Sequence, residues 1–101
     1  MSISKQYLKT KPVCKVTFKL NKEKSKSVDS VHIVGDFNGW NPQATPMKKR
    51  KNGDFAATVD LDRYKEYQFR YLKNEKEWVN DTDADKFVPS PFGEDNSVIV
   101  V

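Results

Sequence analysis

The chain has 101 residues, of which 37% are hydrophobic, 12% are aromatic and 32% are charged. This length suits one domain with one hydrophobic core and leaves too little chain for a deep enzymatic cleft as well. The aromatic content excludes a disordered chain, because unfolded sequences are poor in Phe, Tyr and Trp. The single cysteine, Cys14, excludes a disulfide framework within the chain.

The charge distribution bears on possible partners. Residues 1–51 carry 12 Lys and Arg against 3 acidic residues, and residues 52–101 carry 6 against 11. A second half as acidic as this is unusual for a polyanion binder, so we expect no nucleic-acid partner. The sequence has no apolar run of signal-peptide or membrane-span length, so we expect a cytoplasmic protein with no membrane partner.

Alternation of apolar and polar residues with a period of two dominates the chain, and turn residues interrupt it at short intervals. In the first such segment, Cys14, Val16 and Phe18 share one face, which predicts that Cys14 is a core residue. About seven short antiparallel strands are predicted, at residues 13–20, 31–35, 47–51, 54–61, 66–72, 77–79 and 97–101. The expected fold is therefore all-β, an immunoglobulin-like sandwich over residues 13–101 with residues 1–12 as an N-terminal extension.

Three connections carry their own signals. The segment 36–42 combines Asn-Gly with Asn-Pro, which favours a turn over regular structure. Asn52-Gly53 lies between two predicted strands and predicts a type I′ hairpin turn, in which both central residues have positive φ. Residues 80–96, which contain Pro89 and Pro91, are predicted to be irregular.

The sequence offers little support for catalysis or metal binding. Fourteen acidic residues allow many carboxylate pairs, but none lies in a recognisable cleft-forming context. His32, the one histidine, lies inside a predicted strand, and together with Cys14 it supplies too few ligands for a zinc site. The run Asp81–Asp85 resembles the start of a calcium loop, but Lys86 and Phe92 stand where that loop needs glycine and glutamate. We therefore expect a solvated acidic loop there, and no enzyme activity, metal or cofactor.

The basic run Lys48–Lys51 is the only other charged motif of note. Such runs occur in nucleic-acid-binding patches. This one directly precedes the predicted turn at Asn52-Gly53, so we expect it to be the exposed arm of a hairpin. Charge on such an arm discourages edge-to-edge association of sheets.

Two tryptophans remain as binding candidates. Trp40 lies in the Gly/Asn/Pro turn, and Trp78 lies just after a predicted hairpin. An indole offers a large apolar face with few torsions to freeze, which suits the flat C–H faces of a sugar ring. Arg70 and Asn96 could then bond the hydroxyls. Taken singly, however, a loop tryptophan covers a core about as often as it forms a ligand platform.

Five ordered sequence blocks carry a resemblance to a known family. They are residues 34–40 (VGDFNGW), 44–47, 66–71, 78–81 and 89–98. They are similar to the family-48 carbohydrate-binding modules, which include the isoamylase N-terminal early-set domain and the glycogen-binding domain of the AMP-activated protein kinase β subunit. The resemblance covers roughly residues 13–101. It implies an early-set sandwich that binds α-1,4-glucans such as glycogen, starch or maltooligosaccharides without catalysis, here as a stand-alone module.

The resemblance also implies a site. Two tryptophans stack on the sugar, a lysine position is occupied by arginine, and a late loop supplies an apolar residue and an asparagine. The residues concerned are Trp40, Trp78, Arg70, Phe92 and Asn96.

Three features depart from the pattern of the kinase-type members. The hairpin before Trp78 lacks its usual glycine, and Glu94 stands at a threonine position. The Pro89–Gly93 block looks more like early-set domains attached to enzymes. An alternative expectation is therefore an interaction domain that docks a glucan-processing enzyme, with weak or lost sugar binding. The expected partners are an α-glucan and, on the alternative, a glycogen-metabolising enzyme.

Overall fold

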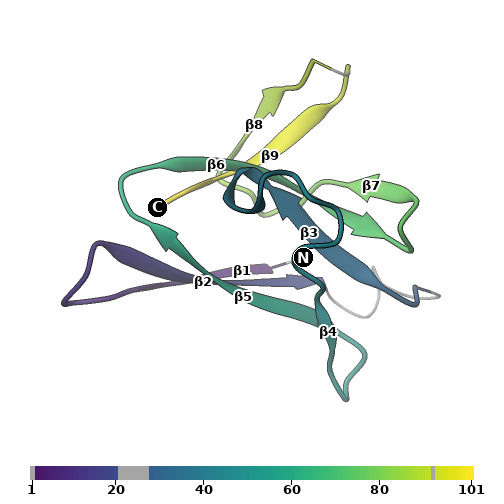
Figure 1. Cartoon of the computed structure of the whole chain (residues 1–101), viewed down its shortest axis with the longest axis horizontal. Helices are drawn as coiled ribbons and strands as arrows, with labels where there is room; N and C mark the ends of the chain where they lie inside the picture. Colours follow the sequence, from purple (N-terminus) through teal and green to yellow (C-terminus); the bar gives the residue numbers. More distant parts are fainter. Residues whose placement is uncertain (1, 21–27, 92) are drawn as a thin grey trace.

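The computed structural model describes residues 2–20, 28–91 and 93–101 (Figure 1). This part of the chain forms nine strands and one 3-10 turn: β1 (Ser2–Tyr7), β2 (Val13–Leu20), β3 (Val31–Gly35), η1 (Asp36–Asn38), β4 (Lys48–Lys49), β5 (Phe55–Asp62), β6 (Glu66–Lys73), β7 (Glu77–Val79), β8 (Lys86–Pro89) and β9 (Asp95–Val100). Its residues include no helix long and apolar enough to cross a membrane.

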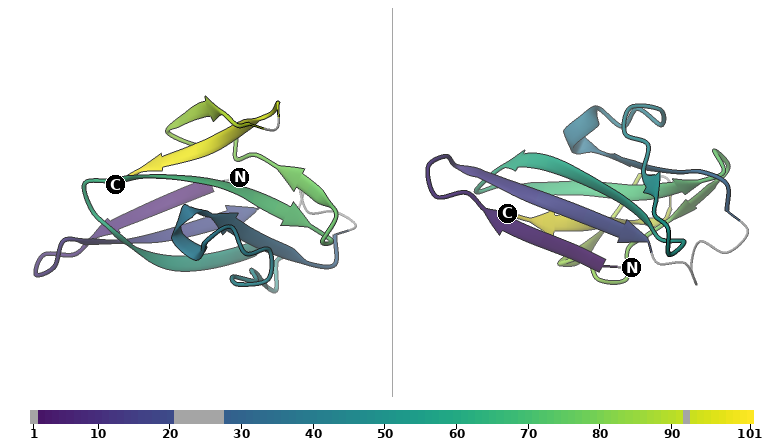
Figure 2. Two further views of the ribbon diagram at one scale, coloured as in Figure 1. Left: turned by 45° about the horizontal axis from the view of Figure 1, so that its top comes forward. Right: turned by 90° about the horizontal axis from the view of Figure 1, so that it is seen from below.

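The strands form two antiparallel sheets that face each other (Figures 1 and 2). Sheet A has the order β1-β2-β5-β4. Sheet B has the order β3-β6-β9-β8, and β7 also pairs with β6. The predicted all-β, immunoglobulin-like sandwich is confirmed.

The core lies between the sheets and follows from the alternation of their strands. On β2, Cys14, Val16 and Phe18 are fully buried, and the unpaired thiol of Cys14 is a core group as predicted. On the facing sheet, Phe69 and Tyr71 of β6 are also fully buried. The rings of Phe18 and Phe69 meet edge to face, with centroids 5.0 Å apart. Alternate residues of β6 therefore point outward, away from this core.

The structure adds strand β1 within residues 1–12, the segment predicted as an N-terminal extension. β1 pairs with β2 over its whole length, and Ile3 packs against the core. Lys5 also joins the two sheets, because its Nζ lies 2.8 Å from Asp85 Oδ2 and donates to the Val100 carbonyl at 2.9 Å. Asp85 Oδ2 in turn accepts the Val100 backbone N–H at 2.7 Å. These contacts fasten the first strand of the chain to the last.

The structure also adds strand β8 within residues 80–96, where the prediction of irregular structure was wrong. β8 pairs with β9 at the edge of sheet B. An edge strand tolerates Pro89, since one side of it needs no ladder partner. Lys86 and Phe87 are both exposed, so the segment lacks the buried alternation that identifies a strand from sequence.

The hairpin turn at Asn52-Gly53 differs from expectation, whereas the hairpin before Trp78 is found as predicted. Among the residues with positive φ, Gly53 is present at 93° but Asn52 is not, so the type I′ prediction was wrong there. Arg50 N–H donates instead to the Asp54 carbonyl at 2.6 Å, across a connection longer than two residues. The basic run from Lys48 to Lys51 lies in β4 and this turn and is exposed, as predicted.

The pair of positive φ angles occurs in the other hairpin. Asn74 and Glu75, between β6 and β7, have φ of 50° and 60°. Lys76 N–H closes the turn on the Lys73 carbonyl at 2.9 Å. Both central residues are thus left-handed, as a type I′ turn requires, although neither is glycine.

Candidate functional site

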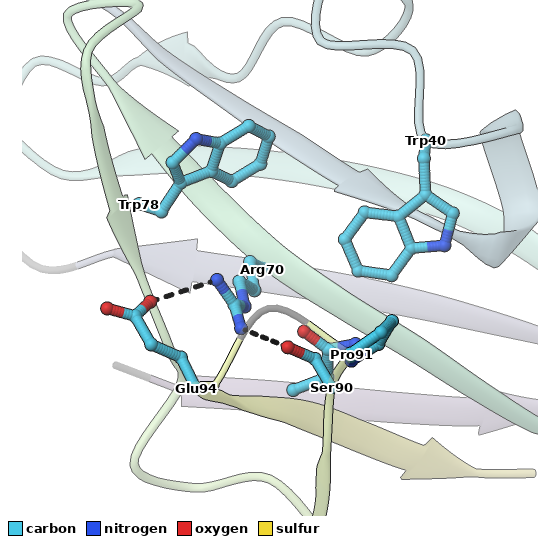
Figure 3. A pocket seen from close by; sticks show the side chains of 7 residues that line it. Trp40, Arg70, Trp78, Ser90, Pro91 and Glu94 are labelled. Carbon is cyan, nitrogen blue, oxygen red and sulfur yellow. Dashed lines mark hydrogen bonds and ion pairs between the residues drawn. The ribbon is translucent and has the colours of Figure 1, made fainter.

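A hollow of about 500 Å³ opens on the outer face of sheet B. It lies where one edge of β6 changes partner: Phe69 pairs with β9, and Tyr71 pairs with β7. Arg70 lies at this change, which we call the β6 junction, and points to the side opposite Phe69 and Tyr71. The hollow is lined by Trp40, Arg70, Trp78, Ser90, Pro91, Glu94 and Asn96 (Figure 3).

The turn that carries Trp40 begins at Gly35, a position with no room for a larger residue. A Cβ on Gly35 would lie 2.5 Å from the Gln68 carbonyl oxygen and 2.7 Å from Phe69 Cβ. Glycine therefore allows β3 to end against β6. The chain then passes through η1 into two left-handed residues, Gly39 with φ of 68° and Trp40 with φ of 58°. A left-handed tryptophan is strained, and such strain is typical of functional positions.

Asp36 fixes the Trp40 indole. Its Oδ1 accepts the Trp40 Nε1–H at 2.8 Å, and its Oδ2 accepts the Gln68 backbone N–H at 2.8 Å. The Trp40 backbone N–H also donates to the Gly35 carbonyl at 2.9 Å. The one polar atom of the indole is therefore engaged, and the ring faces are left for contact with a ligand. Trp40 is half-buried.

Asn38 ties the same turn to its surroundings. Its Oδ1 accepts the Gly35 N–H at 3.0 Å, and its Nδ2 donates to the Ile33 carbonyl and to Thr45 Oγ1, both at 3.0 Å. An amide side chain can make these bonds at once because it carries both donors and an acceptor. The sequence block at residues 34–40 is thus a folded unit, with each polar side chain engaged.

Trp78 is positioned differently, by the short strand β7. It pairs with Leu72, so its side chain lies on the outer face with that of Arg70. The side chain is 42% exposed, and no hydrogen bond of its indole is seen within residues 2–20, 28–91 and 93–101. The turn before it is anchored on the start of β3, because Asn74 Oδ1 accepts the backbone N–H groups of Asp29 and Ser30 at 2.7 and 3.3 Å.

A buried polar group fastens the chain after Trp78 to β9. Asp81 N–H donates to Ser97 Oγ at 2.9 Å, and Asp81 Oδ2 accepts the Tyr71 hydroxyl at 2.6 Å. Asn80 accepts from Ser97 N–H at 3.0 Å and donates to the Asp95 carbonyl at 2.8 Å. Burial raises the pKa of the Asp81 carboxyl above its ordinary value, although the hydrogen bond from Tyr71 opposes this. Burial first, and then the nearby Asp81, raise the pKa of Tyr71.

The prediction of a solvated acidic loop at 81–85 was wrong for Asp81, which is fully buried. Asp83 and Asp85 are exposed. Partial burial acts to raise the pKa of Asp85, but Lys5 and the Val100 N–H together lower it below its ordinary value. Among the described residues, no group of three or more His, Cys, Asp or Glu is placed to hold a metal ion.

Arg70 and Glu94 form the polar part of the hollow. Arg70 Nη1 lies 3.1 Å from Glu94 Oε2, and Arg70 Nη2 donates to Ser90 Oγ at 3.4 Å. Figure 3 shows Arg70 and Glu94 below Trp78, with Trp40 and Pro91 on the other side of the hollow. Asn96 is 7% exposed, and its Nδ2 donates to Gln68 Oε1 at 2.9 Å.

Four of the five predicted site residues line this hollow together: Trp40, Arg70, Trp78 and Asn96. The fifth, Phe92, lies outside the described residues. Sequence reasoning did not assign Ser90, Pro91 or Glu94 to the site. Their proximity in sequence to Phe92 was the available signal.

Comparisons with known proteins bear on the fold and the family. The family model described as carbohydrate-binding module 48 (isoamylase N-terminal domain) matches residues 9–93, and no curated protein sequence matches significantly. Among solved structures, the enterobactin esterase FES from Shigella flexneri is similar, with a TM-score of 0.72 and 14% identity over 98% of this chain. The chain spans only 32% of that esterase, and the likeness shows the fold alone. The family match takes in most of the chain, including Trp40, Arg70 and Trp78, and the chain therefore belongs to the carbohydrate-binding module 48 (isoamylase N-terminal domain) family.

Proposed function

We propose that the hollow on sheet B binds an α-1,4-glucan, such as glycogen, starch or a maltooligosaccharide. The family is one of carbohydrate-binding modules, which are non-catalytic in general. The observation that carries the proposal is that Trp40, in the turn after η1, and Trp78, on strand β7, line one hollow together with Arg70 (Figure 3).

The chemistry of the lining suits a sugar chain. Indole faces stack on the C–H faces of glucose rings, and a few polar groups between them bond the hydroxyls. A volume of about 500 Å³ lies within the range of ligand sites. The hollow is open to solvent along Trp78, so few contacts become fully buried. We expect a dissociation constant on the order of micromolar to millimolar.

We propose binding without cleavage. Glycosidic hydrolysis in most enzymes needs two carboxyl groups around the scissile bond. Glu94 is the one carboxylate among the seven described residues that line the hollow, and its partner is Arg70. This arrangement supports a role in recognition.

Titration with maltoheptaose, followed by tryptophan fluorescence and calorimetry, tests the proposal. Trp40→Ala and Trp78→Ala should each weaken binding at least tenfold, because each removes a stacking platform. Tyr64→Ala is the matched control: Tyr64 is a highly exposed aromatic residue that does not line the hollow, and its loss should leave binding unchanged. Folded wild-type protein that binds neither maltoheptaose nor glycogen would refute the proposal.

The same titration distinguishes glucan binding from the alternative, an interaction domain that docks an enzyme. A domain that docks a glucan-processing enzyme through these tryptophans would show no fluorescence response to sugar. It would instead co-purify with that enzyme, and Trp78→Ala would abolish the co-purification.

A further inference from the structure

Arg70 is a poor candidate for direct contact with a ligand, despite its place in the hollow. Its side chain is only 10% exposed. Both terminal nitrogens are engaged, Nη1 with Glu94 and Nη2 with Ser90. Its Nε is buried and has no partner among the described residues. A sugar that settles between the indoles therefore meets few free donors of this guanidinium.

Glu94 has the opposite character. Its side chain is 71% exposed, and it lines the hollow on the side of Trp78 (Figure 3). One carboxylate oxygen, Oε2, is fixed by Arg70 at 3.1 Å, while Oε1 has no partner within the described part of the chain. A fixed, exposed carboxylate is an acceptor ready for hydroxyl donors, and hydrogen bonds to a charged acceptor are about twice as strong as neutral ones.

We propose that Glu94 is the residue that selects the ligand of this site, and that Arg70 is a positioning residue that holds its carboxylate in place. The proposal rests on the proposed glucan binding and adds a specificity to it. Glu94 accepts hydrogen bonds from sugar hydroxyls. The same negative charge faces solvent with its positive partner enclosed behind it, so the site favours neutral glucans over glucans that carry phosphate or carboxylate groups.

The first test compares two probes, maltoheptaose and a maltodextrin that carries phosphate monoesters, at an ionic strength of about 0.15 M to limit long-range attraction by the basic chain. The wild type should bind maltoheptaose at least tenfold more tightly than the phosphorylated probe. Glu94→Gln keeps the shape and removes the charge. It should weaken maltoheptaose binding about fivefold and bring the two probes within about twofold of each other.

The second test separates positioning from direct contact. Arg70→Met should weaken maltoheptaose binding in the wild-type background but change it less than about 1.5-fold in the Glu94→Gln background, because there is then no carboxylate to hold. Arg70→Lys keeps a charge beside Glu94 and should lose less than Arg70→Met. Near-ultraviolet circular dichroism checks that each variant is folded. If the Arg70 variants do not fold, Glu94→Gln still tests the role of Glu94, because the Glu94 side chain is exposed.

The outcomes are distinguishable. If Trp78→Ala abolishes binding while Glu94→Gln binds both probes as the wild type does, the role of Glu94 is refuted and glucan binding stands. If Arg70→Met weakens binding equally in both backgrounds, Arg70 contacts the sugar itself and the positioning role is refuted. If the folded wild type binds neither probe, glucan binding itself fails.

Discussion

The two tryptophans of the hollow differ in how firmly the structure holds their side chains. Trp40 is half-buried, its indole N–H is bonded to Asp36, and its backbone is held in a left-handed turn by Gly35 and Asn38. Trp78 is 42% exposed on a three-residue strand, and only its backbone is anchored. A site in which a hydrogen bond holds one indole and, among the described residues, none holds the other can bind ring faces of varied tilt, because the held indole sets the position and the other can adapt.

The largest effect on this contrast should come from Gly35→Ala. The added Cβ would meet the Gln68 carbonyl and Phe69 Cβ at 2.5 and 2.7 Å, and neither can move far in a paired strand. We expect a loss of about 3 kcal/mol in the free energy of unfolding, measured by urea denaturation.

Gly39→Ala is the matched control for this change. Gly39 has open space around the Cβ position but a φ of 68°, so it should cost only about 1 kcal/mol. A loss at Gly35 no larger than that at Gly39 would show that the approach of β3 to β6 does not require a glycine, since the backbone of Gly35 is extended.

Asp36→Ala should convert Trp40 into a loosely held side chain like Trp78. Two hydrogen bonds to a carboxylate are lost, which should reduce the free energy of unfolding by about 1.5 kcal/mol. Maltoheptaose affinity should fall about fivefold, because the indole must then be ordered on binding. Asp60→Ala, at an exposed aspartate of β5 in sheet A, should change neither quantity. Unchanged affinity in the folded Asp36 variant would mean that fixing the indole contributes nothing to binding.

Glu75→Gly should tighten the Trp78 side. Glu75 has φ of 60°, a conformation that glycine adopts without the steric cost of a Cβ. The variant should be more stable by about 1 kcal/mol, which raises the melting temperature by about 5 °C for a domain of this size. Glu77→Gly, two residues on within β7, should be destabilising. A lower melting temperature for Glu75→Gly would show that its side chain contributes more than its backbone strain costs.

The smallest effect concerns the carboxyl group that fastens the chain after Trp78. The folded-state pKa of Asp81 is raised by burial, so its contribution to stability is full below the ordinary pKa of 3.8 and declines as pH rises through the raised value. Asp81→Asn should remove this decline. The decline in the free energy of unfolding should be below about 1.4 kcal/mol for each unit by which the pKa is raised. Urea midpoints measured from pH 3 upward test this, with Asp85→Asn as the comparison.

Asp85 should behave in the opposite sense. Its folded-state pKa is lowered despite partial burial, so its contribution is present above the ordinary value and is lost as pH falls through the lowered one. Asp85→Asn should therefore reduce the loss of stability in acid. Parallel pH profiles for the two variants would contradict the assignment.

The fold was predictable where one face of a strand is buried. β2 alternates in burial along its length, and β6 alternates in sequence from Tyr67 to Tyr71, and both were found. β1 and β8 were not predicted, because β1 places only Ile3 against the core and β8 is an exposed edge. Their pairing is decided by tertiary contacts, such as that of Lys5 with Asp85, which no local pattern contains.

Most residues of the site were predictable from the sequence, but their burial and hydrogen-bond partners were not. The resemblance supplied Trp40, Arg70, Trp78 and Asn96, yet it could not show that Arg70 is enclosed by Glu94 and Ser90. That enclosure depends on Ser90, after β8, and Glu94, before β9, reaching Arg70 of β6, and partners this distant in sequence leave no spacing to read.

The β6 junction has a consequence for how this surface can change in evolution. The hollow lies on the outer face of sheet B, at Arg70, where the pairing of β6 changes from β9 to β7. Phe69 and Tyr71 point to the opposite face, where they are fully buried in a core that does not include the residues of the hollow. The exposed residues of the hollow, Trp78 and Glu94, can therefore be exchanged without a gap opening in the interior. A lineage can change the ligand preference of this surface through these two positions while the core between the sheets is kept.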